Sequence, residues 1–275
     1  MSGQPRVRGR EWFQALTGVN APMEQDPASV LTADAKLGDE VARFLCVVPD
    51  PQGRFPCARR GEVGLEEAYT LAHRVREVGT RDADAKKAPI VAIVDVKSQA
   101  YGRREETAAI FLAAAAAGDA YATARMEGHP LIALVVGHAI SGGFLTHGYQ
   151  ANRILAFDDA GVVIHAMHKE AAARITLRSV ADLERIGHEI LPMSYDVKDF
   201  AKLGVLSHIL HVENPDVPSP ATVAQVRQAL IASIADARSG STDLVNRIES
   251  AGALEWRKAG QAARTLMKEQ WEAAQ

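Results

Sequence analysis

The sequence predicts a layered α/β fold with a mainly parallel sheet, and three observations predict it. Apolar runs of strand length alternate with segments of helical periodicity through most of the chain. The 275 residues are 47% apolar, which is enough for a sizeable core. The segments between the apolar runs are long enough for helical crossovers, which join parallel strands.

The first half of the chain predicts two strand–helix repeats after an irregular start. The strands are apolar runs, the helix at 65–79 has an apolar face and a C-terminal Gly79, and the helix at 104–126 is rich in alanine. In chain order we expect a helix at 11–17, an irregular Pro-containing stretch at 18–39, a strand at 42–50, a helix at 65–79, a strand at 88–96 and one long helix at 104–126.

The second half predicts shorter elements and a helical end. The strands at 153–157 and 161–165 are separated by the turn residues Asp158, Asp159 and Gly161, and the helix after the PDVPSP linker carries an apolar stripe. We expect strands at 129–137, 153–157, 161–165 and 205–210, helices at 142–150, 170–175, 182–190 and 195–204, a linker at 215–220, a helix through Val223, Val226, Leu230 and Ile234, and a last helix through Trp256, Ala259, Ala263 and Leu266.

These elements suggest three regions along the chain. Residues 1–40 are expected to be an N-terminal extension, and residues 41–214 are expected to form the α/β domain. Residues 215–275 are expected to be a helical region that packs on the core or on a partner.

Composition excludes several classes of protein. The net charge is -3 and aromatic residues make up 5%, so we expect no nucleic-acid partner. No apolar run approaches the length of a membrane span, and the first residues, with Arg6, Arg8 and Arg10, lack the apolar core of a signal peptide. Cys46 and Cys57 lack the spacing of a metal or redox motif. We therefore expect a cytoplasmic protein without membrane association.

The stretch GHAISGG, residues 137–143 and here called the glycine turn, is the strongest candidate for chemistry. It joins a predicted strand to a predicted helix, whose first N–H groups have no partner inside the helix. Glycines let a ligand approach such N–H groups, which suit an anion or an oxyanion that forms during reaction. Close packing alone also explains glycines at such a turn. The glycines at 137, 142 and 143 do not fit the G-x-G-x-x-G dinucleotide motif.

Ser141 is compatible with two roles. The hydrolase nucleophile motif is G-x-S-x-G, but Ala139 stands where its first glycine belongs. Serine is also a preferred helix N-cap, and an N-cap or turn role is favoured over that of a nucleophile.

Four histidines follow the glycine turn or belong to it: His138, His147, His165 and His168. Some are expected to line a cleft as donors or acids, and others to be surface or satisfied interior residues. The pair at 165 and 168 lacks a third ligand at a recognisable spacing, so we expect no metal site.

The upstream turn, residues 97–104, repeats the same strand–turn–helix order. Both turns are therefore expected to open on one edge of the sheet, where ligands of open α/β folds bind. Lys97, Arg103 and Arg104 are candidates to meet a carboxylate or phosphate there, or else to be solvated at the start of a helix.

At this point the order of motifs resembles a known family. The sequence IVAIVDV, the upstream turn, the alanine-rich helix and GHPLIALVVGHAISGGFLTHGYQ are similar to the carboxyltransferase branch of the crotonase superfamily, in particular the acetyl-CoA carboxylase carboxyltransferase alpha subunit. HAMHKEAAARI and YDVKDFAKLGVLSHIL look most like the gamma subunit of biotin-independent malonate decarboxylase. The resemblance covers roughly residues 40–212 and implies a crotonase-like ββα superhelix.

The resemblance also implies an activity and partners. A gamma subunit pairs with a homologous beta subunit, as a heterodimer or in a higher oligomer. Their shared active site decarboxylates a malonyl thioester on an acyl carrier protein to the acetyl thioester and carbon dioxide. The thiol belongs to a CoA-like prosthetic group of the carrier, and this chain is expected to bind no biotin, metal or other cofactor of its own.

The family pattern assigns roles to residues of this chain. The N–H groups of Gly142 and Gly143 would form the oxyanion pocket, shaped by Gly137 and Ser141, and would hold the malonyl carboxylate. The chain has Lys97-Ser98-Gln99 where alpha subunits have a proline-glycine turn, so Gln99 or Tyr101 would replace a second donor set. The proton donor would be His138, His165 or His168, a beta-subunit residue or water.

Three alternatives remain at this stage. An acyl-CoA hydratase or isomerase would need paired acids near the glycine turn, where only Asp158, Asp159 and Glu170 are available. A ClpP-like serine protease would need an activated Ser141. A non-catalytic scaffold subunit would need none of these residues.

Overall fold

The computed structural model describes residues 7–274 of the chain. Residues 1–6, which include Arg6 and the start of the predicted N-terminal extension, lie outside the described residues. Residue 275 at the end of the predicted helical region also lies outside them.

The predicted α/β fold class is confirmed by a central sheet in the order β1-β2-β3-β4-β5-β7, with β6 paired to the end of β4. Only β1 and β2 are antiparallel, and all other strand pairs are parallel. The strands are β1 (Val30–Leu37), β2 (Glu40–Val47), β3 (Ile90–Val96), β4 (Leu131–Ile140), β5 (Arg153–Phe157), β6 (Val163–His165) and β7 (His208–Leu210).

The irregular stretch predicted at residues 18–39 is wrong, because its second half forms β1. All eight residues of β1 pair with β2, from Val30 opposite Val47 to Leu37 opposite Glu40. The sequence VLTADAKL contains Asp34, Lys36 and two alanines, which are residue types depleted in strands, and pairing with the apolar β2 stabilises it. The expected boundary between the N-terminal extension and the α/β domain, at residues 40 and 41, falls at the start of β2 in this hairpin. β1, which lies before that boundary, belongs to the central sheet.

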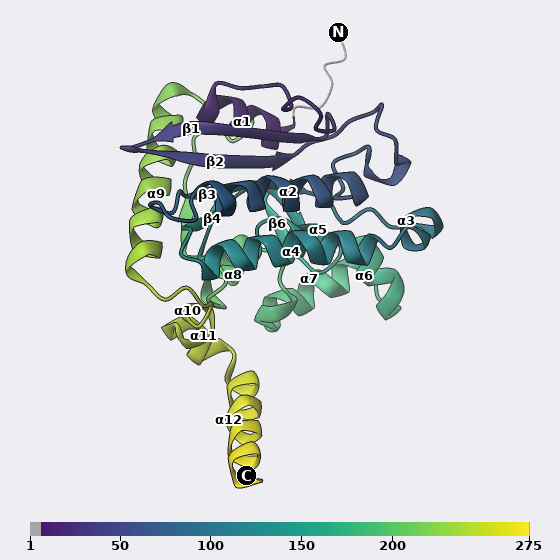
Figure 1. Ribbon diagram of the computed structural model, residues 1–275. Coiled ribbons are helices and arrows are strands. Elements are labelled where there is room, and N and C mark those ends of the chain that lie inside the picture. Colours follow the sequence, from purple (N-terminus) through teal and green to yellow (C-terminus); the bar gives the residue numbers. More distant parts are fainter. Residues whose placement is uncertain (1–6, 275) are drawn as a thin grey trace.

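Helices cover both faces of the sheet (Figure 1). α2 (Leu65–Arg81) and α4 (Ile110–Met126) pack against each other on one face. α1 (Arg8–Thr17) lies across β1 and β2 on the opposite side from α2, and α9 (Pro220–Ser239) packs on α1 and β4 (Figure 1). Trp12 of α1 is fully buried against the ring of Phe157, so the N-terminal helix is part of the core.

The single helix predicted at 104–126 is also wrong. The segment forms α3 (Arg103–Thr107) and α4, separated at Ala109, whose backbone adopts a left-handed φ of 61°. Alanine is the strongest helix former, so the composition of the segment gives no sign of this break.

Four further predicted helices are present with bounds displaced by a few residues: α5 (Ser141–Thr146), α6 (Lys169–Thr176), α7 (Val180–Glu189) and α8 (Val197–Lys202). The last helix, predicted as one segment through Trp256 and Leu266, is divided into α11 (Ala251–Trp256) and α12 (Lys258–Ala273). The sequence did not predict α10 (Asn246–Glu249) or the short 3-10 turns at Pro56–Ala58 and Leu191–Met193. α12 extends away from the body of the molecule, and none of its residues is buried (Figure 1). In the part of the chain described here, no helix combines the length and apolarity that crossing a bilayer requires.

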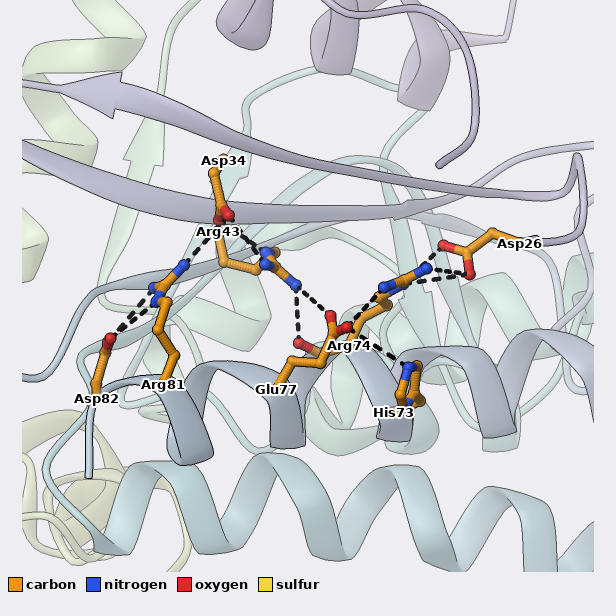
Figure 2. Close-up of polar contacts among 8 residues, drawn as sticks. All are labelled: Asp26, Asp34, Arg43, His73, Arg74, Glu77, Arg81 and Asp82. Atoms are coloured by element: carbon orange, nitrogen blue, oxygen red, sulfur yellow. Dashed lines mark hydrogen bonds and ion pairs between the residues drawn. The ribbon is translucent and has the colours of Figure 1, made fainter. Parts of the chain in front are cut away.

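A chain of ion pairs connects the β1–β2 hairpin to α2 (Figure 2). Arg43 of β2 contacts Asp34 at 2.7 Å and Glu77 at 3.1 Å. Arg74 then contacts Glu77 at 2.7 Å and Asp26 at 2.9 Å, and the Asp26 side chain is only 6% exposed. These contacts fix the hairpin and the loop before it on the helix that follows.

Candidate active site

The glycine turn and the upstream turn lie at the same edge of the sheet, as predicted. β3 and β4 are parallel neighbours, so their carboxyl ends meet, and each strand leads into one of the turns. The Gly142 N–H donates a hydrogen bond to Gln99 Oε1 at 2.9 Å, which joins the two turns directly.

This hydrogen bond corrects the expectation that the Gly142 N–H is open to a ligand. In the isolated chain its acceptor is the side-chain oxygen of Gln99, a residue that was expected to supply a donor. A Cβ atom at Gly142 would stand 2.9 Å from the same oxygen, so glycine is needed for this approach. The amide can serve a ligand only when the half-buried Gln99 side chain moves.

Two other glycines of the turn are explained by close packing. A Cβ atom at Gly143 would collide with the carbonyl of Ser98, and one at Gly137 would collide with the Asp95 carboxylate. The packing explanation therefore accounts for these two positions, whatever further role their N–H groups have.

Ser141 stands at the strand-to-helix turn but is not the N-cap of α5, so the cap part of that prediction is wrong. Ile140 occupies the cap position without a side-chain hydrogen bond, and Ser141 is the first helical residue with a left-handed φ of 58°. Such a backbone is unusual for a residue other than glycine and often marks a functional turn. Among the described residues no histidine hydrogen-bonds Ser141, so the arrangement lacks the base that a nucleophile needs.

Ser141 and Gly142 line an apolar pocket of about 280 Å³ together with His165. Its walls are mainly the side chains of Phe144, Tyr149, Ile164 and Phe200. The His165 ring stacks on Tyr195 with 3.8 Å between centroids, and its Nδ1 lies 3.1 Å from Met167 O. Burial lowers the pKa of His165, which favours the neutral imidazole in this pocket.

Gly137 and His138 line a second and wider space, a polar cleft of about 840 Å³ beside the N-terminus of α1. Lys97 and four arginines, Arg8, Arg10, Arg59 and Arg60, also line this cleft. The rings of His138 and His168 lie 6.0 Å apart, and His168 Nε2 donates to Lys97 O at 2.9 Å. The structure thus divides the predicted residues between an apolar pocket and a polar cleft, joined through residues 97–99.

Other candidates fall outside this arrangement. His147 is fully buried between Tyr121 and Ile93 O, so it cannot reach a ligand. Tyr101 is 65% exposed and lines neither the pocket nor the cleft. Arg104 lies over the Phe55 ring at 4.9 Å, which fits the solvated-arginine interpretation.

The acids near the turn do not form a catalytic pair. Asp158 pairs with Lys198 at 3.1 Å, Asp159 pairs with Arg8 at 2.6 Å, and Glu170 is exposed at the start of α6. Over residues 7–274, no three histidine, cysteine or acidic side chains are grouped to hold a metal ion.

Sequence reasoning missed Asp95 and Tyr195. Asp95 lies in β3 within the otherwise apolar run IVAIVDV, and an acid in a buried strand is a signal that the sequence contains. Tyr195 donates its hydroxyl to Met167 O at 2.9 Å and packs against His165, a contact between distant segments that no local pattern indicates.

Comparison with known families gives one match over most of the chain. The model of the family described as malonate decarboxylase gamma subunit matches residues 58–271. A curated relative from Malonomonas rubra, the malonyl-S-ACP:biotin-protein carboxyltransferase MADD, is 39% identical over 137 residues. That match covers 48% of this chain and 47% of the relative, so the matched part spans about half the length of that relative.

Solved structures agree with the family match. A Pseudomonas malonate decarboxylase hetero-tetramer in complex with coenzyme A contains a chain 52% identical to this one, with a TM-score of 0.91 over 96% of this chain and 100% of that chain. The Pseudomonas MdcD-MdcE hetero-dimer gives 51% identity and a TM-score of 0.89 over 96% and 100% of the two chains. The transcarboxylase 12S structure, at 18% identity and a TM-score of 0.59 over 78% and 37% of the two chains, shares the fold.

Proposed function

This chain belongs to the malonate decarboxylase gamma-subunit family, and we propose that it forms, with a homologous beta subunit, the active site that decarboxylates a malonyl thioester. The thioester is carried by an acyl carrier protein, on the thiol of a CoA-like prosthetic group. The products are the acetyl thioester and carbon dioxide. One observation carries the proposal. In a chain of this family, the Gly142 N–H, just after the end of β4, donates a hydrogen bond to a side-chain oxygen.

The reaction defines what the site must do. The bond between the malonyl carboxylate and the α-carbon breaks, and its electron pair moves onto the thioester oxygen to form an enolate. The α-carbon then takes a proton and the thioester carbonyl is restored. Fixed N–H donors stabilise such an oxyanion, and a held carboxylate keeps the breaking bond out of the plane of the carbonyl.

The geometry of Gln99 supports an anion site at the glycine turn. Gln99 Oε1 is a carbonyl oxygen 2.9 Å from the Gly142 N–H, so it stands where a carboxylate oxygen of a ligand would stand. We infer that the malonyl carboxylate displaces this oxygen when it binds, and that the beta subunit supplies the donors for the thioester oxygen. A carboxylate accepts the stronger hydrogen bond, because charge roughly doubles the strength of such bonds.

The surroundings suit a thioester substrate. The apolar pocket of about 280 Å³ lies directly beside Ser141 and Gly142, and it can exclude water from the reacting carbons. His138 and His168 stand at the same edge of the sheet as candidates to supply the proton. No biotin or metal enters this scheme.

Reconstitution tests the proposal. The chain is combined with its beta-subunit homologue and a malonyl carrier labelled in the free carboxyl group, with each chain omitted in turn. We expect labelled carbon dioxide only when all three components are present. Release of label by the chain without the beta homologue would contradict the shared site. With a biotin carrier protein added, transfer of label to that protein without free carbon dioxide would instead assign the carboxyltransferase activity named for the Malonomonas relative.

A further inference from the structure

Asp95 is a largely buried acid that has no role yet in the proposed function. Its side chain is 14% exposed at the end of β3, next to the glycine turn. One carboxylate oxygen accepts the Gly9 N–H at 3.2 Å, and the other accepts the His138 N–H at 3.1 Å. The latter oxygen also lies 3.7 Å from Nδ1 of the His138 imidazole, a distance of ion-pair approach.

Two glycines make room for this carboxylate. A side chain at Gly137 would collide with it, and a Cβ atom at Gly9 would stand 3.2 Å from the Asp95 Cβ and 3.0 Å from Cys46 Sγ. The first residue of the glycine turn is therefore a glycine because Asp95 is there.

His138 is the only basic side chain in ion-pair contact with Asp95 among residues 7–274. A buried carboxylate costs several kcal/mol unless it is paired or hydrogen-bonded, so its partners decide whether it stays charged. Burial raises the pKa of Asp95, but the approach of the His138 imidazole and the two backbone N–H groups outweigh burial and lower that pKa below its usual value. Asp95 is thus an ionised group directed at one histidine.

Asp95 and His138 both line the polar cleft, and His138 is the more exposed of the two. Its side chain is 37% exposed and lines the polar cleft, and its ring lies 6.0 Å from that of His168. With Nδ1 turned to Asp95, Nε2 lies on the far side of the ring. A carboxylate beside one ring nitrogen orients the ring and favours a proton on that nitrogen.

We propose that Asp95 is a positioning residue that holds His138 with Nδ1 protonated, and that His138 delivers the proton to the α-carbon after decarboxylation. This inference rests on the proposed function. In the step, the Nε2–H bond of the imidazolium breaks, a C–H bond forms at the α-carbon, and the enolate electrons restore the thioester carbonyl. Neutral His138 then keeps its Nδ1 proton toward Asp95 and regains a proton at Nε2 from water in the cleft.

The tautomer of His138 tests the positioning role without any activity. The full chain is labelled with ¹⁵N-histidine, the His138 signals are identified by their loss in His138→Gln, and the neutral ring is observed at alkaline pH. We expect the Nδ1–H tautomer in the wild type and a shift to the Nε2–H tautomer in Asp95→Asn. A wild-type ring protonated on Nε2 would overturn the proposal, even if Asp95→Asn did not fold.

A double-mutant cycle in the reconstituted complex tests the catalytic consequence. We expect His138→Gln to lower kcat about 100-fold or more, as loss of a general acid does, and Asp95→Asn to lower it about 10-fold or more. The double variant should be no slower than His138→Gln, because Asp95 acts through His138.

Asp119→Asn is the matched control. Asp119 lies on α4, outside the pocket and the cleft, 67% exposed and paired with Arg76, and its loss should leave kcat unchanged. If the kcat losses of Asp95→Asn and His138→Gln multiply in the double variant, Asp95 has a structural role and the proposal is overturned. A wild-type complex that releases no carbon dioxide would contradict the proposed function instead, while the tautomer result would stand on its own.

Discussion

At the scale of single residues, the glycine turn combines packing and chemistry. Gly137 and Gly143 are required by the Asp95 carboxylate and the Ser98 carbonyl, whereas Gly142 presents an N–H to an exchangeable oxygen. The sequence predicted that this turn matters, because three glycines and a histidine follow a buried strand. The sequence could not separate the roles of the glycines, because these roles depend on Asp95 of β3 and Ser98 of the turn that follows β3.

A second residue-scale feature, the buried His147, predicts a pH dependence of stability. Its Nε2–H donates to Ile93 O at 2.9 Å, so Nδ1 must accept from the Tyr121 hydroxyl, also at 2.9 Å, and the ring must be neutral. Burial lowers the pKa of His147 from 6.5 to about 4. The unfolded chain therefore takes up this proton at a higher pH than the folded chain. The contribution to stability is present above pH 6.5 and is lost as the pH falls toward 4.

We expect this loss to be ~3 kcal/mol over that range. The free energy of unfolding in urea, measured at pH 7 and near pH 4 for the wild type and for His147→Gln, checks it. The wild type should lose more stability than the variant, while His73→Gln, at an exposed position, should behave as the wild type does. Equal losses in the wild type and His147→Gln would contradict the assignment.

At the scale of elements, the sequence predicts the core strands and α2, but not the edge strand β1 or the break between α3 and α4. β3, β4 and β5 are apolar runs, and α2 has a clear apolar face, so local pattern and tertiary burial agree. β1 contains Asp34 and Lys36 and pairs with β2 along its whole length, and the break at Ala109 lies in an alanine-rich segment. Pairing across the sheet decides β1, which a local pattern cannot indicate, and no residue type in the alanine-rich segment marks the break.

The ion pairs between α2 and the N-terminal hairpin give an element-scale prediction (Figure 2). Asp26 raises the pKa of Arg74 through their hydrogen bonds, and the two side chains are only 6% and 12% exposed. Arg74→Leu would leave Asp26 buried without a partner, so we expect the free energy of unfolding to fall by ~3 kcal/mol or more. Urea unfolding at neutral pH measures this change.

Arg76 provides the matched control two residues further along the same helix. It pairs with Asp119, but the two side chains are 54% and 67% exposed, so Arg76→Leu should change stability by less than ~1 kcal/mol. Adding Asp26→Leu to Arg74→Leu should recover much of the loss. Equal effects of Arg74→Leu and Arg76→Leu would show that burial of the Asp26 pair does not matter.

At the scale of the whole molecule, α1 and α9 pack on the central sheet, although the sequence places them in regions outside the predicted α/β domain. α1 packs Trp12 against Phe157, and α9 crosses back onto β4, so helices far apart in the sequence contribute to one body. α12 is the exception, because it leaves that body with Leu266, Met267 and Trp271 exposed (Figure 1).

This arrangement predicts that α12 contributes little to the stability of the isolated chain. Ending the chain after Arg257 removes no buried residue of α12, so we expect the free energy of unfolding to change by less than ~1 kcal/mol. Comparison of urea unfolding for the full and shortened chains measures the difference. A loss of several kcal/mol would mean that α12 packs on the body of the isolated chain.

The central claim is that the Gly142 amide receives the malonyl carboxylate in place of Gln99 Oε1, and Gln99→Glu tests it most directly. The substituted carboxylate has the same shape, accepts the amide hydrogen more strongly, and repels the anionic substrate. In the reconstituted complex we predict that kcat/KM for the malonyl carrier falls about 100-fold or more. Gln52→Glu, which adds the same charge on an exposed loop, should leave it unchanged. A Gln99→Glu complex within twofold of the wild type would contradict the account.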